Sequence, residues 1–113
     1  MDMDDVIYYN ELYDLYGKLL TDKQREYFED YYFNNLSFSE LAENYNVSIN
    51  AVFKQLKITK EKLLEFDNAL KLYEKKKKII DLIDCIQDKD IKEKLEDLIW
   101  LSLFSCKWIK KNV

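Results

Sequence analysis

Apolar residues recur at helical spacing in the first third of the chain. Leu12, Leu15 and Leu19 stand three and four positions apart, with tyrosines between the apolar positions, and predict an amphipathic helix over residues 4–19. Gly17 lies near the end of this helix, where glycine commonly helps to stop one. Thr21, followed three residues later by Gln24, forms a capping box and predicts the start of a second helix.

The second predicted helix runs to about residue 33 and carries an aromatic face. Its rings recur three and four residues apart, so we expect them to pack into the core. Base stacking is the alternative role for such rings. The acidic residues around them disfavour that role. The four rings belong to Tyr27, Phe28, Tyr31 and Tyr32.

Residues 38–57 have the spacing of a helix-turn-helix. Ser37 and Glu40 form a second capping box ahead of a short helix at 38–44, and Ser48 caps the helix that follows. Asn46 occupies the turn position that needs a positive φ, which asparagine tolerates better than most residues. The small Ala42 lets the two helices cross closely. The apolar positions of the motif are Leu41, Tyr45, Val47 and Val52.

No stop signal follows the helix-turn-helix for many residues. We therefore predict one long helix from Ile49 to about Gln87, with leucines seven residues apart in its first part and a bend near the lysine run at 75–78. Asp90 and Glu93 form a box-like cap for a final helix from Ile91 to about Ile109. The apolar end of that helix, residues 98–109, is expected to pack against the long helix. A dimer or partner surface and docking on a membrane surface are the alternatives.

Composition strengthens the all-α prediction, because the 113 residues include no proline and one glycine. Tight turns in sheets usually require those residues. A chain of this length fits one compact unit. Within it we expect a helix-turn-helix domain at 1–66 and a C-terminal helical extension at 67–113. A small domain buries a limited share of its surface, so a partner or second copy would add stability.

The sequence lacks the residues that most catalytic and metal sites use. It has no histidine, no glycine-rich phosphate loop and only two cysteines, Cys85 and Cys106, which we expect to be buried thiols. We therefore expect no enzyme activity, no cofactor and no metal. The acidic start does not resemble a signal peptide, and no apolar stretch approaches about 20 residues. These features predict a cytoplasmic protein without membrane insertion.

Charge is unevenly distributed along the chain. Residues 1–46 carry 11 acidic and 3 basic side chains, whereas residues 47–113 carry 11 acidic and 15 basic ones. Between Val47 and Lys60 there are three lysines and no acidic residue. Local positive charge of this kind is what phosphate contacts in nucleic-acid binding require. The acidic first half would repel nucleic acid or face a basic protein partner.

Two motifs, at 21–24 and at 37–48, lie on either side of Tyr31-Tyr32 in the aromatic helix, and Ala51-Val52 follow the second motif. This combination resembles the YlxM family of bacterial helix-turn-helix proteins. The resemblance covers about residues 6–75, and the family's motif looks like region 4 of sigma factors. The family is typically encoded beside components of the signal recognition particle. The resemblance therefore implies an accessory or regulatory role in that pathway, and the motif implies sequence-specific DNA binding.

Three positions depart from the family pattern. Members tend to carry Arg-Gln directly after the capping serine, where Ile49 and Asn50 stand here, and Ile58 occupies the place of a later arginine. Arginine is the commonest specific reader of guanine, so these changes weaken base readout. The lysines that remain retain positive charge, mainly for phosphates.

These observations leave three hypotheses for function. The first is an accessory module that contacts the RNA or the GTPase of the signal recognition particle. The second is a regulator of duplex DNA that forms a homodimer through its C-terminal helices. The third is a purely protein-binding scaffold, favoured by the acidic composition and the missing arginines. The lysine run is a solvated helix face in the plainest interpretation and a phosphate contact in the sharper one. The candidate nucleic-acid-binding residues are Ser48, Asn50, Lys54, Lys57, Lys60, Lys75, Lys76, Lys77 and Lys78.

Overall fold

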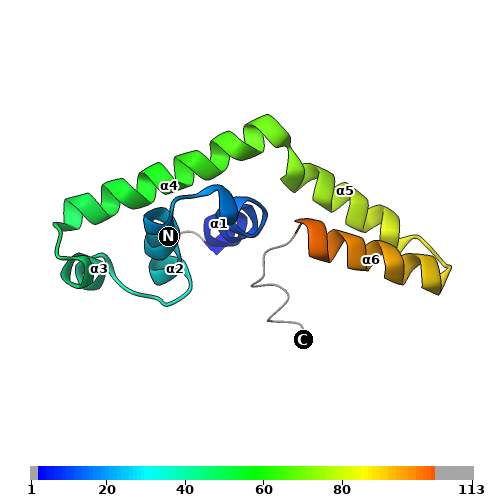
Figure 1. The fold of residues 1–113 in the computed structure, drawn as a ribbon, viewed down its shortest axis with the longest axis horizontal. Helices are drawn as coiled ribbons and strands as arrows, with labels where there is room; N and C mark the ends of the chain where they lie inside the picture. Colours follow the sequence, from blue (N-terminus) through cyan, green and yellow to red (C-terminus); the bar gives the residue numbers. More distant parts are fainter. Residues whose placement is uncertain (1–2, 104–113) are drawn as a thin grey trace.

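The computed structural model describes residues 3–103, and this part of the chain is all-helical. The molecule is elongated and measures 55 × 30 × 25 Å. Helices α1, α2 and α3 pack along the long helix α4 (Figure 1). At the C-terminal end of α4 the chain turns into α5, and α6 runs back alongside α5. The elements are α1 (Met3–Tyr16), the 3-10 turn η1 (Gly17–Leu19), α2 (Asp22–Tyr32), α3 (Phe38–Tyr45), α4 (Ile49–Leu70), α5 (Leu72–Asp84) and α6 (Lys89–Leu103).

Both predicted capping boxes are present. The Thr21 hydroxyl accepts from the Gln24 amide at 3.2 Å, and the Gln24 side chain accepts from the Thr21 amide at 3.0 Å. Ser37 and Glu40 exchange the equivalent pair of bonds, each at 3.1 Å. Each cap satisfies amides that the helix leaves without partners, and contributes about 1 kcal/mol. The starts of α2 and α3 are therefore fixed by local sequence.

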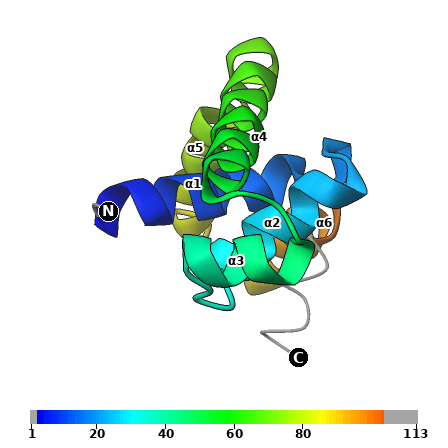
Figure 2. The ribbon, with the colours of Figure 1, turned by 90° about the vertical axis from the view of Figure 1, so that its left-hand side faces the viewer.

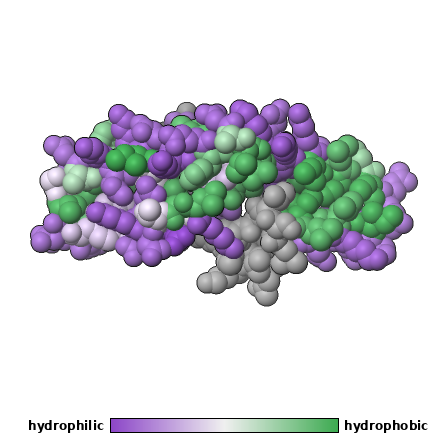
Figure 3. All heavy atoms as spheres, turned by 45° about the horizontal axis from the view of Figure 1, so that its top comes forward, coloured by the Kyte–Doolittle hydropathy of each residue, from purple (hydrophilic) through white to green (hydrophobic). Residues whose placement is uncertain are grey.

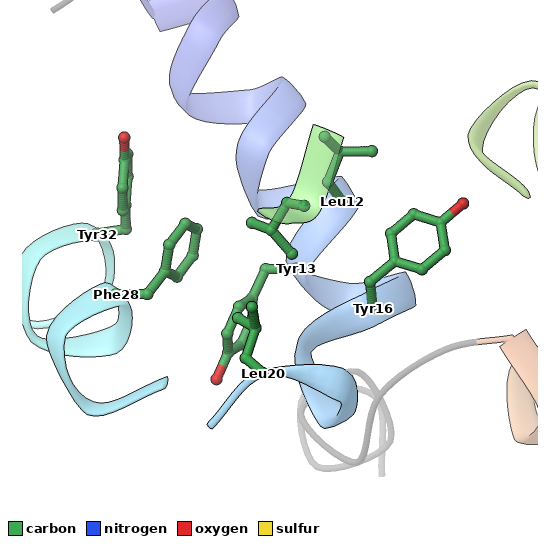
Figure 4. Close-up of a cluster of buried hydrophobic side chains, with 7 residues drawn as sticks. Leu12, Tyr13, Tyr16, Leu20, Phe28 and Tyr32 are labelled. Carbon is green, nitrogen blue, oxygen red and sulfur yellow. The ribbon is translucent and has the colours of Figure 1, made fainter. Parts of the chain in front are cut away.

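The aromatic residues of α1 and α2 form the main core, as predicted for the α2 face. Tyr13 of α1 stacks on Phe28 of α2 with ring centroids 4.5 Å apart and planes within 6° (Figure 4). Leu63 of α4 is fully buried in the same cluster. Gly17 lies against the Tyr13 ring, and a Cβ there would be 3.2 Å from it. Glycine is therefore favoured at this point by close packing.

A second cluster lies beneath the helix-turn-helix and buries most of its predicted apolar positions, whereas Val47 is 37% exposed. Leu41 and Ala42 of α3 pack with Val52 and Leu56 of α4. Asn46 has φ 54° and ψ 49°, the left-handed conformation predicted for the turn. The Val47 amide donates to the Ala42 carbonyl at 3.0 Å, a hydrogen bond typical of helix ends with a left-handed residue. Figure 2, which views the molecule from the α3 end, shows α3 crossing the start of α4.

The prediction of one long helix from Ile49 to Gln87 is wrong. The helix breaks at Lys71, which has φ 57°, ahead of the lysine run, and α5 ends at Asp84. The Tyr16 hydroxyl donates to Asp67 Oδ1 at 2.6 Å and accepts from the Leu72 amide at 3.1 Å. Asp67 Oδ1 also accepts from the amide of residue 73 at 3.1 Å. These side chains satisfy amides at the start of α5 that the break leaves without helical partners.

The predicted cap of the final helix was misplaced by two residues. Helix α6 begins at Lys89, and Asp88 Oδ1 accepts from the amides of Asp90 and Ile91 at 3.0 and 3.2 Å. The Asp90 side chain instead pairs with Lys94 at 3.1 Å. Asp88, and not Asp90, caps the helix because it directly precedes the first helical residue. From that position its short side chain reaches the amides of the first turn.

The α5–α6 hairpin has a small core of its own and an exposed apolar surface. Ile83 and Ile99 are buried against each other's helices, whereas Leu82 and Leu98 are 69% and 62% exposed. Hydrophobic atoms gather over this end of the molecule in Figure 3. Cys85 is exposed, so the expectation of a buried thiol there is wrong, because it lies past the last turn of α5. Cys106 and the rest of the predicted apolar end beyond residue 103 lie outside the described residues.

Helix α5 also contacts the helices at the start of the chain. Leu72 and Tyr73 of α5 pack against the main aromatic cluster, and Tyr73 meets the ring of Tyr8 edge-on at 5.1 Å. The predicted division into 1–66 and 67–113 stays a prediction. These contacts set the direction in which α5 leaves α4.

Candidate nucleic-acid interface

The first turns of α4 present a polar face directed away from the core. Asn50, Lys54 and Lys57 follow one another at spacings of four and three residues, so they share one face of the helix, and all three are exposed. Val52 and Leu56 point the other way, into the core. The structure therefore brings together these three predicted site residues on a single surface, called the α4 outward face below.

The two lysines of this face are available for a ligand. Within residues 3–103, neither Lys54 nor Lys57 forms an ion pair, and α4 has no acidic residue in its first turn. The amides at a helix N-terminus also carry partial positive charge. Glu61, one turn beyond Lys57, is the first acidic side chain along α4 and ends the basic surface.

Ser48 is the N-cap residue of α4, next to the α4 outward face. Its hydroxyl oxygen accepts from the Ala51 amide at 3.0 Å and caps α4. The hydroxyl proton remains able to donate to a phosphate oxygen. The serine thus positions the start of the recognition helix and lies beside the α4 outward face.

Lys60 lies on a different side of α4. It is half-buried, and its ammonium lies 5.2 Å from the ring centroid of Tyr9 and 6.0 Å from that of Tyr32. Such cation–π contacts hold the charge next to the aromatic rings of α1 and α2. Nearness in the sequence alone groups Lys60 with Lys54 and Lys57, but the packing of α1 and α2 against α4 decides its surroundings.

The lysine run on α5 does not form one basic surface. Lys75 is exposed, whereas Lys76 is half-buried and burial lowers its pKa, with Glu11 and Asp14 of α1 acting in the opposite direction. Lys78 pairs with Glu74 at 3.2 Å.

Lys77 lies 4.4 Å from the ring centroid of Tyr73, and a hydrogen bond with that side chain raises the lysine pKa. The run also lies beyond the break at Lys71, away from the α4 N-terminus (Figure 1). The structure therefore separates these four lysines from the α4 outward face.

Sequence reasoning missed Phe53. This residue is 55% exposed on α4, and its ring meets the ring of Phe38 edge-on at 6.1 Å. The signal was present in the sequence: the buried stripe of α4 runs through Val52, Leu56 and Leu63, which leaves position 53 outside it. A large ring outside the core stripe of a recognition helix is a candidate contact residue.

Residues 3–103 contain no metal cluster and no membrane-spanning helix. Across residues 3–103, no group of three or more His, Cys, Asp or Glu side chains is placed to hold a metal ion. Over the same residues, no helix has both the length and the apolar character needed to cross a membrane.

Comparison with known proteins gives one consistent family. Residues 3–100 match UPF0122, described as "Putative helix-turn-helix protein, YlxM / p13 like". A UPF0122 protein of Ureaplasma urealyticum serovar 10 is 47% identical over 87 residues, which cover 77% of this chain and 88% of the relative.

Two more distant relatives extend the comparison. A UPF0122 protein of Mycoplasma capricolum is 38% identical over 96 residues, covering 80% of this chain and 85% of the relative. One of Fusobacterium nucleatum is 36% identical over 99 residues, covering 88% and 96%. The match includes the helix-turn-helix, α5 and most of α6. The chain belongs to the UPF0122 family of YlxM-like helix-turn-helix proteins.

Proposed function

We propose that this protein is a nucleic-acid-binding regulatory or accessory protein, and that its α4 outward face contacts the phosphate backbone. The observation that carries the proposal is the shared exposure of Asn50, Lys54 and Lys57 on a capped recognition helix that has no acidic residue of its own before Glu61. Lysine contributes charge to phosphate contacts, which supply most of the sequence-independent affinity for nucleic acid. Asn50 is the residue suited to a base contact, because asparagine pairs with adenine through two hydrogen bonds.

The nucleic acid to test first is the RNA of the signal recognition particle. Its support is the resemblance of the helix-turn-helix to the YlxM family, together with a face that carries lysines and lacks the arginine pattern of a base reader. Duplex DNA is the alternative target, supported by the helix-turn-helix motif itself. The acidic α1 and α2 would face a basic protein, and the particle's GTPase is the candidate partner for that side.

A homodimer through the C-terminal helices is a second part of the proposal. It is supported by the exposed Leu82, Ile91 and Leu98 on the α5–α6 hairpin, whose own core is small. Regulators of duplex DNA with this motif commonly bind two half-sites as dimers. Sedimentation of the full chain would test this part, and a concentration-independent monomer would contradict it.

The proposal is tested by fluorescence anisotropy with labelled signal recognition particle RNA and labelled duplex DNA at equal ionic strength. The double variant Lys54→Gln/Lys57→Gln should bind each target more weakly, by a similar factor on every sequence, because phosphate contacts carry no sequence information. The control Lys18→Gln/Lys89→Gln removes the same charge from two exposed lysines elsewhere. Equal weakening by the control would show that only net charge matters and would contradict a specific role for α4.

A further inference from the structure

A groove runs beside the α4 outward face, between α4 and the three helices that precede it. It encloses about 340 Å³, near the lower limit for small-molecule pockets. Four aromatic rings line it, contributed by four different helices: Tyr9, Tyr31, Phe38 and Phe53. Because the two core clusters fix these helices against α4, the rings are held in place before any ligand arrives.

The rings are arranged as a partly open stack. Tyr31 and Phe38 stack with centroids 5.0 Å apart and planes 27° from parallel. Phe53 meets Phe38 at 75° and leaves 55% of its surface exposed. Aromatic rings with free surface bind flat, aromatic ligands well, since every nucleobase presents a π-face for stacking.

The rim of the groove is positively charged overall and favours a negatively charged ligand. Lys57 and Lys60 both border it, and Lys60 is held over the Tyr9 ring at 5.2 Å. Glu61 is the one acidic residue among the lining residues, so the rim as a whole is positive. Lys57 belongs to the groove and to the α4 outward face at once. The arrangement fits a ligand with a flat aromatic group between two negatively charged groups. A nucleotide within a strand is such a ligand, because its base lies between two phosphates.

We propose that the groove receives an unpaired nucleobase of a nucleic acid bound at the α4 outward face. The base stacks on the exposed face of the Phe53 ring with the Phe38 ring at its edge, and Lys57 and Lys60 contact the phosphates on either side of it. This inference rests on the proposed function and deepens it, because it makes an unpaired nucleotide beside a helical stem the preferred target. Bulges and loops expose such bases in structured RNA.

The test compares two RNA duplexes that differ by one unpaired nucleotide. One is fully paired, and the other carries a single bulged 2-aminopurine whose fluorescence reports stacking. The wild-type chain should bind the bulged duplex about tenfold more tightly, within the range that one stacked base provides, and should change the fluorescence of the bulged base. The variant Phe53→Leu should lose both effects and keep its affinity for the paired duplex.

Two further variants separate stacking from folding and charge. Leu19→Ala removes a comparably exposed apolar side chain on the 3-10 turn η1 and should behave as wild type. Lys60→Gln should weaken binding of the bulged duplex more than that of the paired one. Equal wild-type affinity for the two duplexes, or a bulge preference retained by Phe53→Leu, would overturn the groove assignment and leave the proposed function standing. An apolar protein segment as the true occupant would give the first of these results. Failure to bind either RNA duplex would overturn the groove assignment, and failure to bind duplex DNA as well would overturn the proposed function.

Discussion

The break between α4 and α5 gives a sharp prediction, because one substitution changes stability in opposite directions depending on whether the break exists. Lys71 has φ 57° at the joint, and its exposed side chain takes part in no ion pair within the described residues. Replacing it with glycine therefore tests the backbone conformation alone.

The expected magnitude follows from two opposing terms. The left-handed conformation costs a residue other than glycine roughly 1–2 kcal/mol, which Lys71→Gly removes. Glycine loses more backbone entropy on folding, about 0.5–1 kcal/mol compared with alanine. The free energy of unfolding should thus rise by about 0.5–1 kcal/mol. In a continuous helix the same change would lower it by about 1 kcal/mol.

Urea unfolding followed by far-UV circular dichroism measures this difference. The midpoint should move to higher urea for Lys71→Gly at an unchanged slope. The matched control is Lys75→Gly, because Lys75 is also exposed but lies within α5. The control should lose about 1 kcal/mol. If Lys71→Gly were destabilising to the same extent as Lys75→Gly, the break would not exist, and the argument built on Tyr16 and Asp67 would fail.

Three other predictions follow from named groups. Ser48→Asp should leave stability unchanged, because aspartate caps a helix as well as serine does. It should weaken nucleic-acid binding, because the carboxylate repels phosphate. Unchanged affinity in fluorescence anisotropy would show that the ligand binds elsewhere. Tyr32→Phe should be neutral or stabilising in urea unfolding, because the buried Tyr32 hydroxyl has no hydrogen-bond partner among the described residues; a loss above about 1 kcal/mol would reveal a partner. Burial, aided by acidic neighbours, raises the pKa of Tyr13 and Tyr45 above the ordinary value of 10.0. The unfolded chain then releases these protons first, so the contribution of the two tyrosines to stability should be constant below about pH 10 and fall above it. Urea midpoints that do not fall above about pH 10 would contradict these shifts.

The helix-turn-helix could be predicted from sequence because its signals are local. The Ser37–Glu40 box, the Ser48 cap and the left-handed Asn46 each depend on residues within a few positions. The buried stripe through Val52 and Leu56 follows from helical period alone. The same period places Lys54 and Lys57 on the opposite, exposed face of α4; their role in binding stays a prediction.

The break at Lys71 could not be predicted from local sequence. No glycine or proline marks it, and the hydroxyl that accepts from the Leu72 amide comes from Tyr16, 56 residues earlier. The surroundings of Lys60 and Lys76 have the same cause, since the tyrosines of α1 and α2 and the acidic residues of α1 reach them only in the folded chain. Long-range packing therefore decided which lysines remain available to a ligand.

The most direct test of the central claim, phosphate binding by the α4 outward face, is the salt dependence of duplex DNA binding. The logarithm of the binding constant is measured against the logarithm of salt concentration for the wild-type chain and for Lys54→Gln/Lys57→Gln. Each phosphate contact contributes about 0.9 to the slope on B-form DNA, so the double variant should have a slope smaller in magnitude by about 2. An unchanged slope would show that these two lysines do not contact phosphate and would contradict phosphate binding by the α4 outward face.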